Sequence, residues 1–395
     1  MKLASRMSRV AESATLQVSR RAKEMARQGV EVIDWSAGEP DFDSPAVAVE
    51  AARRALADGF TRYTPAVGIP RLREALAERY ARAYGAPWGP GDVGVSVGAK
   101  AALFELALAL YEPGDEVVLP SPCWVSFPEQ IRLAGAEPVT VPTSPADSFR
   151  IHADALIERF TERTRAVLVN SPSNPTGGVI GAEDLRRLAA ACAERDILLV
   201  CDETYERFVY DGGTHASVAA LAGEFPDTVV LVGSFSKTYA MTGWRLGYFF
   251  APPAVFRAVS DVQSHATSNP TSFAMAGAVA ALEQGESAVA EMIAEYAARR
   301  ELLVPRLDAL PGVTCRPPSG AFYAFPDVSE HSADRVIGSV ALAEYLLEEA
   351  HVAVVPGEAF GDDRHIRISF ACSRDELERG LARIAEALVA LTPRV

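Results

Sequence analysis

SFSKTYAMTGWRLG, residues 234–247, is the stretch that decides how this chain folds. It follows an apolar run, residues 228–233, so Lys237 is expected where a buried strand opens into a loop at the sheet edge. A lysine amine forms a Schiff base with a carbonyl compound when its surroundings keep it neutral and accessible. Ser234 and Arg245 lie nearby in sequence and suit a phosphate. A lone Ser-x-x-Lys is more often a surface lysine near a turn, so the prediction rests on the whole stretch.

Outward from this stretch, strand and helix patterns alternate from about residue 46 to residue 290. Helices are predicted over residues 46–59, 69–84, 99–111, 153–160 and 182–194. Strands are predicted over residues 92–98, 116–120, 137–141, 165–170, 197–201, 228–233 and 245–250. This order indicates an α/β fold, with an open, doubly wound and mostly parallel sheet covered by helices on both faces.

Beyond Pro270 the pattern is helical to residue 310. Short strands are expected near residues 313–315, 321–325, 352–355 and 365–370, before a last helix over 375–391. A chain of 395 residues also exceeds what one hydrophobic core usually supports. We therefore expect an N-terminal arm and first part of a small domain (1–45), a large domain (46–290) and the rest of a small α+β domain (291–395).

The composition limits the classes of function. The net charge of −14 argues against non-specific nucleic-acid binding. No run of about 18 apolar residues predicts a membrane span, and the N-terminus lacks the features of a secretory signal. The five scattered cysteines fit reduced thiols in a cytoplasmic protein, and we expect no metal site.

Polar and aromatic residues stand where predicted strands end. Asp202 follows the strand 197–201, where a carboxylate either needs a cationic partner or caps a helix. Asn174 precedes Pro175, so it is extended and its amide is free to form hydrogen bonds. Trp124 follows another strand beside a proline, where it either stacks on a flat ring or packs in the core.

Four further positions have both a functional and an ordinary interpretation. Residues 98–100, Gly-Ala-Lys, open a helix whose N-terminus suits an anion, although they match neither common nucleotide-binding loop. Gly38, in SAGEPDFDSP, and Tyr63 have ordinary roles in a turn and in packing. Arg367 lies in an apolar strand, where its planar group forms either a salt bridge or a clamp for a ligand carboxylate.

Taken in order, these segments resemble the class I and II aminotransferases, which are fold-type I enzymes dependent on pyridoxal 5′-phosphate. The resemblance runs from Gly38 to Arg367. Within the family the chain is similar to bacterial aspartate aminotransferases, through SAGEPDFDSP, SPCWVSFPE, SPSNPTGG, AMTGWRLGY and HIRISFA.

The resemblance implies a role for each catalytic residue. Lys237 would carry pyridoxal 5′-phosphate and move the proton at the substrate's α-carbon. Asp202 would pair with the pyridine nitrogen and raise its pKa, which keeps the ring an electron sink. Tyr205 and Asn174 would donate hydrogen bonds to the 3′-oxygen, and Trp124 would stack on the ring.

The resemblance also implies the remaining contacts. The cofactor phosphate would be bound by Gly98, Ala99, Lys100, Ser234, Arg245 and Tyr63, the last reaching across a homodimer with shared sites. The substrate would contact Gly38, Lys100, Trp124, Asn174 and Arg367. The peptide bonds before Pro122 and Pro175 are expected to be cis. Two departures from the family are Phe127, where some members have a histidine that supports the aspartate, and Cys123, where an aromatic residue is frequent.

The implied function is transfer of the amino group of an L-amino acid, with aspartate preferred, to a 2-oxo acid, with 2-oxoglutarate preferred, by a ping-pong mechanism. In the related branch a lysine at position 100 contacts the distal carboxylate. Aromatic, prephenate or arogenate, and neutral amino-acid substrates stay open, although Ala11-Glu12 replaces a lysine typical of prephenate enzymes. A non-catalytic, cofactor-binding sensor is a distant alternative, because no helix-turn-helix segment is expected before the arm.

Overall fold

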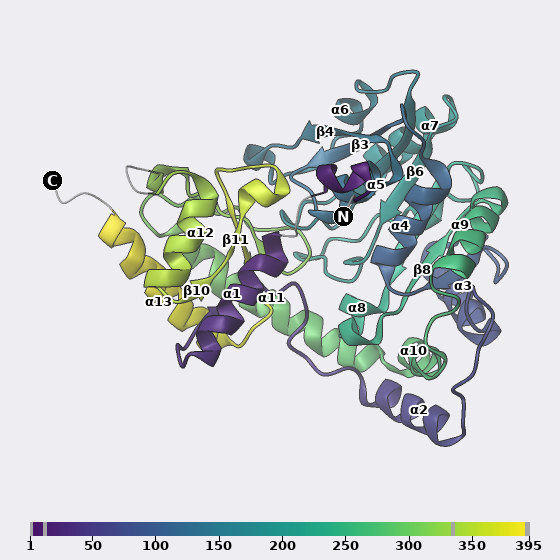
Figure 1. The fold of residues 1–395 in the computed structure, drawn as a ribbon, viewed down its shortest axis with the longest axis horizontal. Helices are drawn as coiled ribbons and strands as arrows, with labels where there is room; N and C mark the ends of the chain where they lie inside the picture. The colour runs from purple at the N-terminus through teal and green to yellow at the C-terminus, as the bar shows by residue number, and fades with distance from the viewer. Residues whose placement is uncertain (1–2, 11–13, 333–335, 392–395) are drawn as a thin grey trace.

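Within the residues that the computed structural model describes (3–10, 14–332 and 336–391), a seven-stranded sheet forms the larger part of the molecule (Figure 1). Its strands, in spatial order, are β2 (Val93–Ser96), β8 (Gly247–Phe250), β7 (Val229–Ser234), β6 (Leu198–Asp202), β5 (Thr164–Asn170), β3 (Glu116–Ser121) and β4 (Glu137–Pro142). Strand β8 is antiparallel to both of its neighbours, and the other described pairs are parallel. The predicted α/β fold with a mostly parallel sheet is confirmed.

Both faces of this sheet are covered. Along β7, Val229 and Leu231 join one hydrophobic core while Val230 and Val232 join another, because successive side chains of a strand point to opposite faces. The first core takes residues from α2 (Ala46–Ala57), α3 (Pro70–Tyr84), α6 (Ala153–Ile157), α7 (Ala182–Ala193) and α10 (Ser272–Gln284). The second takes residues from α4 (Ala99–Leu110), α5 (Ser126–Ala134) and α9 (Pro253–Ala266). Strands buried on both faces are nearly continuous apolar runs, which is why the sequence predicted them.

The smaller part has a core of its own, at the left of Figure 1. Strand β12 (Ile366–Ser369) lies between β11 (Val355–Pro356) and β9 (Tyr323–Ala324), antiparallel to both, and β1 (Ile33–Asp34) pairs with β10 (Val352–Ala353). The helices here are α1 (Ala14–Arg27), α11 (Glu286–Asp308), α12 (Gly338–Glu349) and α13 (Arg374–Leu391). Across both parts of the molecule, short 3₁₀ helices span Ser5–Arg9, Pro145–Asp147, Val218–Leu221, Thr242–Trp244, Ser329–His331 and Gly357–Phe360.

Three local expectations were wrong. Lys237 lies in a one-turn helix, α8 (Phe235–Thr238), because the Ser234 side chain caps the Ser236 amide at 3.0 Å directly after β7. Arg245 precedes β8 in a left-handed conformation, with φ of 55°. Residues 313–315 form an isolated bridge instead of a strand, and the Cys315 amide donates to the Asp308 carboxylate. Helices α1, α5, α9 and α12 were not predicted.

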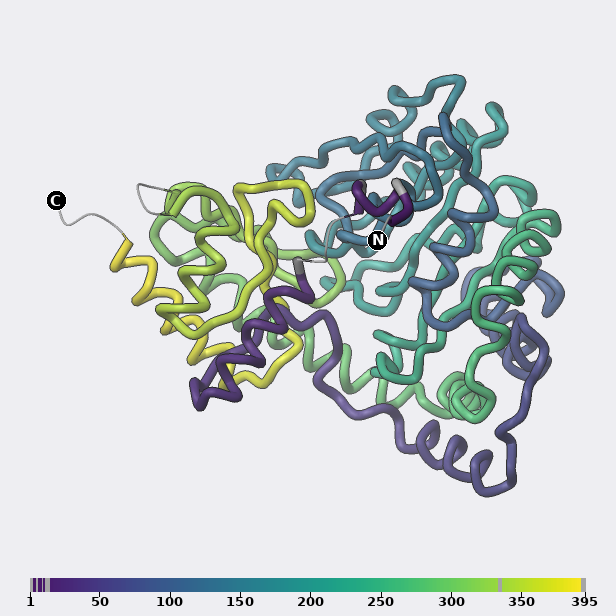
Figure 2. The backbone as a smooth tube through the Cα atoms, in the orientation of Figure 1, coloured from purple at the N-terminus to yellow at the C-terminus, as the bar shows by residue number. Residues whose placement is uncertain are grey.

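Helix α1 and strand β1 belong to the smaller part, and the chain then crosses to the larger part at α2, as Figure 2 shows, whereas the 3₁₀ helix Ser5–Arg9 lies against α5 of the larger part. Helix α11 runs through the predicted boundary at residue 290 without a break. It belongs to both parts, because Val289 joins a core of the large sheet and Met292 joins the core of the smaller part. The domain bounds therefore stay a prediction. Ala11 and Glu12, on which the argument against a prephenate substrate rests, lie outside the described residues.

Candidate active site

A cavity of about 450 Å³ lies at the carboxyl ends of β5, β6 and β7, next to the N-terminus of α4. The predicted site residues that line it are Gly38, Ala99, Lys100, Trp124, Asn174, Asp202, Tyr205, Ser234, Lys237, Arg245 and Arg367. Residues of the smaller part and of the N-terminal segment complete the wall, so the cavity lies between the two parts of the molecule.

Lysines are concentrated in this cavity. The sequence contains four lysines among 38 cationic Lys and Arg residues, and Lys23, Lys100 and Lys237 all line the cavity. Lys2 lies outside the described residues. The chain otherwise uses arginine, which stays charged, whereas lysine can lose its proton when it is buried.

Lys237 extends from α8 into the cavity, where its Nζ donates a hydrogen bond to the carbonyl of Gly38. The pKa of Lys237 is lowered to about 8, chiefly by burial and also by Arg367 and Arg245, while Glu39 and Asp202 oppose this shift. The neutral amine, which is the nucleophilic form, is therefore far more abundant near neutral pH than on an exposed lysine.

Asp202 ends β6 and is buried. One carboxylate oxygen accepts from the Thr204 amide at 3.0 Å, and burial raises the pKa of Asp202 to about 6. No described cationic side chain makes an ion pair with this carboxylate. A bound cation facing it would hold it ionised.

Asn170 was missed by the sequence analysis, although it orders two predicted residues. Its side-chain NH₂ donates to the Asp202 carbonyl at 3.0 Å, and its side-chain oxygen accepts from the Asn174 amide at 2.9 Å. Its place at the end of β5, one strand away from Asp202, was the available signal. Asn170 thus sets the relative position of the loops that follow two neighbouring strands.

Arg367 is 2% exposed and enters the cavity from β12. Its Nη2 donates to the Ser36 carbonyl at 2.6 Å and its Nη1 to the Asn174 Oδ1 at 3.2 Å, while its Nε has no hydrogen-bond partner among the described residues. No carboxylate among the described residues forms an ion pair with it, and burial lowers its pKa. A buried guanidinium without an anion is unfavourable, so its surroundings suit a ligand carboxylate.

Tyr205 and Tyr323 meet inside the cavity with their hydroxyl oxygens 2.7 Å apart. Tyr205 follows β6 in the larger part, and Tyr323 belongs to β9 in the smaller part. The sequence predicted only a short strand near Tyr323, because no nearby residue in the chain indicates a contact with Tyr205.

Four of the residues predicted to bind a phosphate line the cavity: Ala99, Lys100, Ser234 and Arg245. Arg245 packs directly on Gly98, where an added Cβ would lie 2.5 Å from the arginine Nη2 and where φ of 84° also disfavours a side chain. The Gly98 amide donates to the Ser96 carbonyl at 2.8 Å, and its contact with a phosphate stays a prediction. The amides of Ala99 and Lys100 belong to the first turn of α4 and have no acceptor within the helix.

Trp124 lies edge-on to the buried Phe127, with ring centroids 5.2 Å apart, and the Lys100 Nζ lies 4.8 Å from the Trp124 ring centroid. Both expected cis bonds, before Pro122 and Pro175, are present, together with an unpredicted one before Pro172. Tyr63 is 89% exposed and does not line the cavity of its own chain.

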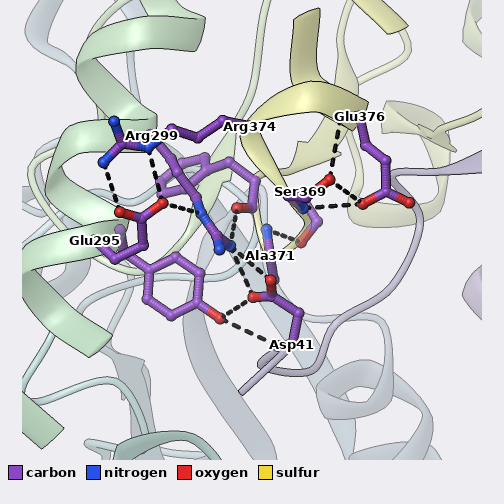
Figure 3. A network of polar contacts seen from close by, with 10 residues as sticks. Asp41, Glu295, Arg299, Ser369, Ala371, Arg374 and Glu376 are labelled. Atoms are coloured by element: carbon purple, nitrogen blue, oxygen red, sulfur yellow. Dashed lines mark hydrogen bonds and ion pairs between the residues drawn. The ribbon is translucent and has the colours of Figure 1, made fainter. Parts of the chain in front are cut away.

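A polar network holds the loop that carries Gly38 (Figure 3). Arg299 of α11 donates from Nη1 to both oxygens of Asp41, at 2.8 and 2.9 Å, and from Nε to Glu295 at 2.9 Å. The same Nη1 lies 3.4 Å from the carbonyl of Phe370, directly after β12, and Arg374 donates to Glu295 at 2.6 Å. One guanidinium thus connects the Gly38 loop with the strand that carries Arg367.

These features fit a known family. A model of the family described as aminotransferase class I and II matches residues 30–384. The chain belongs to this family. A probable aspartate/prephenate aminotransferase from Aquifex aeolicus is 44% identical to it and covers 98% of both chains. The aspartate aminotransferase of Geobacillus stearothermophilus is 43% identical, over 97% of this chain and 98% of its own.

Solved structures agree. The aspartate aminotransferase from Thermus thermophilus with maleate matches this aminotransferase with a TM-score of 0.93 and 43% identity, over 98% of this chain and 100% of the other. The predicted family, fold and amino-transfer activity are confirmed, and the chain is an enzyme, a transferase of amino groups.

Proposed function

We propose that this aminotransferase binds pyridoxal 5′-phosphate at Lys237 and transfers the amino group of L-aspartate to 2-oxoglutarate by a ping-pong cycle. The observation that carries the proposal is that Lys237, Asp202 and Arg367 face one cavity and each lacks the partner that cofactor and substrate would supply. Buried charges without partners are unfavourable, so this set fits a carbonyl cofactor, a cationic ring nitrogen and a carboxylate.

The residues around the ring fit the cofactor. When bound, it supplies an electron sink for the bonds at the substrate's α-carbon. Asp202 would hold the ring nitrogen in its cationic form. Because the Asn174 Oδ1 accepts from Arg367, the Asn174 Nδ2 is left to donate to the 3′-oxygen, alongside Tyr205. Trp124 would stack on the ring.

The phosphate would be held by Ser234, Arg245 and the amides of Ala99 and Lys100, and by Tyr63 of the partner subunit. The 89% exposure of Tyr63 in one chain supports a homodimer with shared sites. Arg367 would hold the α-carboxylate of the substrate, and Gly38 would approach it through its backbone. The amine of Lys237 would then take the proton from the α-carbon, since its low pKa keeps a neutral form available.

Aspartate is supported by the names of the relatives and by maleate, a four-carbon dicarboxylate, in the Thermus thermophilus structure. Lys100, at the rim of the cavity, would bind the distal carboxylate. Relatives named aspartate/prephenate aminotransferase favour prephenate as a second amino acceptor to be tested.

We also propose a cytoplasmic location, which the five free and buried cysteines support. None of the helices in the described residues is long and apolar enough to cross a membrane.

Substrate choice is tested with purified enzyme by measuring kcat/KM for aspartate, glutamate, alanine and phenylalanine as donors, and for prephenate as an acceptor. We expect aspartate and glutamate to be the best donors. Lys100→Ala should lower kcat/KM for these two by roughly tenfold or more, the effect of one charged hydrogen bond, and leave alanine nearly unchanged. Equal losses for all donors would show that Lys100 serves the cofactor, and preference for phenylalanine would overturn the aspartate proposal.

A further inference from the structure

Tyr323 contacts several residues of the site, although its own side chain has no role in the function proposed above. It is fully buried on β9, which pairs with β12, and it still lines the cavity. Its hydroxyl lies 2.7 Å from that of Tyr205, and the Arg367 guanidinium lies 4.5 Å from its ring centroid. A Cβ on Gly38 would lie 3.2 Å from the Tyr323 hydroxyl, so the Gly38 loop also passes close to it.

The hydroxyl contact has a direction. Each phenol carries one proton, and burial raises the pKa of both tyrosines, so both stay protonated at working pH. If Tyr205 uses its proton to donate to the cofactor's 3′-oxygen, the bond between the hydroxyls must use the proton of Tyr323. Tyr323 then donates to Tyr205, and a phenol that accepts one hydrogen bond becomes a stronger donor in the next.

The ring contact serves a different group. The Arg367 guanidinium also lies 5.2 Å from the Phe360 ring centroid, so two aromatic rings contact it while two carbonyl oxygens, those of Ser36 and Asn174, accept its protons. An aromatic face attracts a cation without neutralising it. This arrangement keeps Arg367 in place and leaves its charge for a ligand carboxylate.

We propose that Tyr323 is a positioning residue with two separable roles: its hydroxyl strengthens Tyr205 as a donor to the cofactor, and its ring orients Arg367 for the substrate's α-carboxylate. The inference rests on the proposed function, because it takes the cofactor contact of Tyr205 from there. It connects β9 of the smaller part with the loop after β6 in the larger part.

The hydroxyl role is tested by the pH titration of the visible absorbance of the bound cofactor, in the wild type, Tyr323→Phe, Tyr205→Phe and the double variant. Loss of the Tyr323 hydroxyl should move the midpoint up by about half a pH unit, the size of one neutral hydrogen bond. Tyr205→Phe should move it further, and the double variant should match Tyr205→Phe, because Tyr323 acts only through Tyr205.

The outcomes separate the two hypotheses. A full additional shift in the double variant, or no shift in Tyr323→Phe while Tyr205→Phe does shift, overturns the role of Tyr323 alone. No shift in Tyr205→Phe would instead overturn the proposed cofactor contact of Tyr205, and the inference with it.

The ring role is tested by the KM for aspartate. Tyr323→Phe keeps the ring and should change KM by less than about twofold, whereas Tyr323→Leu should raise it about tenfold with a smaller effect on kcat. Phe360→Leu is the matched control, because Phe360 contacts Arg367 but makes no hydroxyl bond to Tyr205. It should raise KM without moving the absorbance midpoint. An equal KM in Tyr323→Phe and Tyr323→Leu would refute the ring role.

Discussion

The amine of Lys237 lies among charges that oppose one another. Burial and two guanidinium groups, those of Arg367 and Arg245, favour its neutral form, and the carboxylates of Glu39 and Asp202 favour its charged form. Burial is the largest of these effects, so the lowered pKa is a property of the folded cavity. The sequence shows that residue 237 is a lysine, but the pKa of its amine depends on the residues that bury it.

This acidity predicts how Lys237 reacts in the cofactor-free enzyme. Competitive acetylation with acetic anhydride should give half-maximal labelling of Lys237 near pH 8, instead of near the ordinary 10.5, because the neutral amine is the reactive form. Mass spectrometry resolves the peptides easily, since the chain has only four lysines.

The Lys237→Ala variant identifies the labelled peptide by its absence. It should also have no transamination activity while its thermal unfolding shows an intact fold. A midpoint near pH 10.5 would contradict the lowered pKa, and multiple turnovers by Lys237→Ala would contradict the assignment of the catalytic amine.

At the scale of elements, helix α11 joins the two parts and holds the Gly38 loop through Arg299. This arginine is mostly buried, with 7% of its side chain exposed, and its partner Asp41 is 28% exposed. The Asp41 carboxylate also accepts a hydrogen bond from the Tyr296 hydroxyl at 2.9 Å, so the loop is bound by two residues of one helix. The position of Gly38 beside Lys237 therefore depends on a helix far from it in sequence.

Removal of this contact should weaken both stability and substrate binding. Arg299→Met leaves Asp41 without its cation and should lower the free energy of unfolding by roughly 2–4 kcal/mol, near the lower end for a buried pair because Asp41 is partly exposed. It should also raise KM for all donors alike. Thermal unfolding and steady-state kinetics measure the two effects.

Arg306→Met is the matched control on the same helix. Its ion pair with Glu378 is exposed, at 53% and 55%, so it should change stability by less than about 0.5 kcal/mol and leave KM unchanged. Equal effects of the two substitutions would contradict the proposed role of the Arg299 network.

At the scale of the whole molecule, the exposed Tyr63 is the residue expected to cross a dimer interface. A symmetric pair is the commonest oligomer of soluble proteins, and it would place Tyr63 of one chain in the site of the other. Light scattering under assay conditions should give the mass of a dimer, and a fully active monomer would contradict this.

Sharing of sites is tested by mixing two weakly active or inactive variants, Lys237→Ala and Tyr63→Ala. In the mixed dimer, the site with an intact Lys237 receives its Tyr63 from the Lys237→Ala subunit. Unfolding and refolding an equal mixture should therefore recover up to about a quarter of the wild-type activity per site, since half of the dimers carry one complete site. Activity no higher than the sum of the separate variants would show that Tyr63 does not act across the interface.

Local patterns were sufficient for the main sheet and for most of the site. Strands buried on both faces are contiguous apolar runs, and the residues at their ends follow them directly in the chain, as Asp202 and Lys237 do. The α/β order was predicted on that basis, and the sequence named eleven of the residues that line the cavity. The element at Lys237 was wrong because a single side-chain cap from Ser234 starts a helix at once.

By itself, the sequence determined the family, the order of elements and the identity of the reactive groups, because these are carried by short segments whose period and chemistry are local. Tertiary structure alone decided the partners of those groups. Tyr205 meets Tyr323 across 118 residues, within one hydrophobic core, and Arg367 meets Ser36 across 331 residues, beside the hydrogen bond from the Ser369 amide to the Trp35 carbonyl. Both contacts exist only because segments far apart in the chain pack together. The same packing lowers the pKa of Lys237 to about 8 and buries Arg367 without an anionic partner among the described residues, since burial is set by the whole fold.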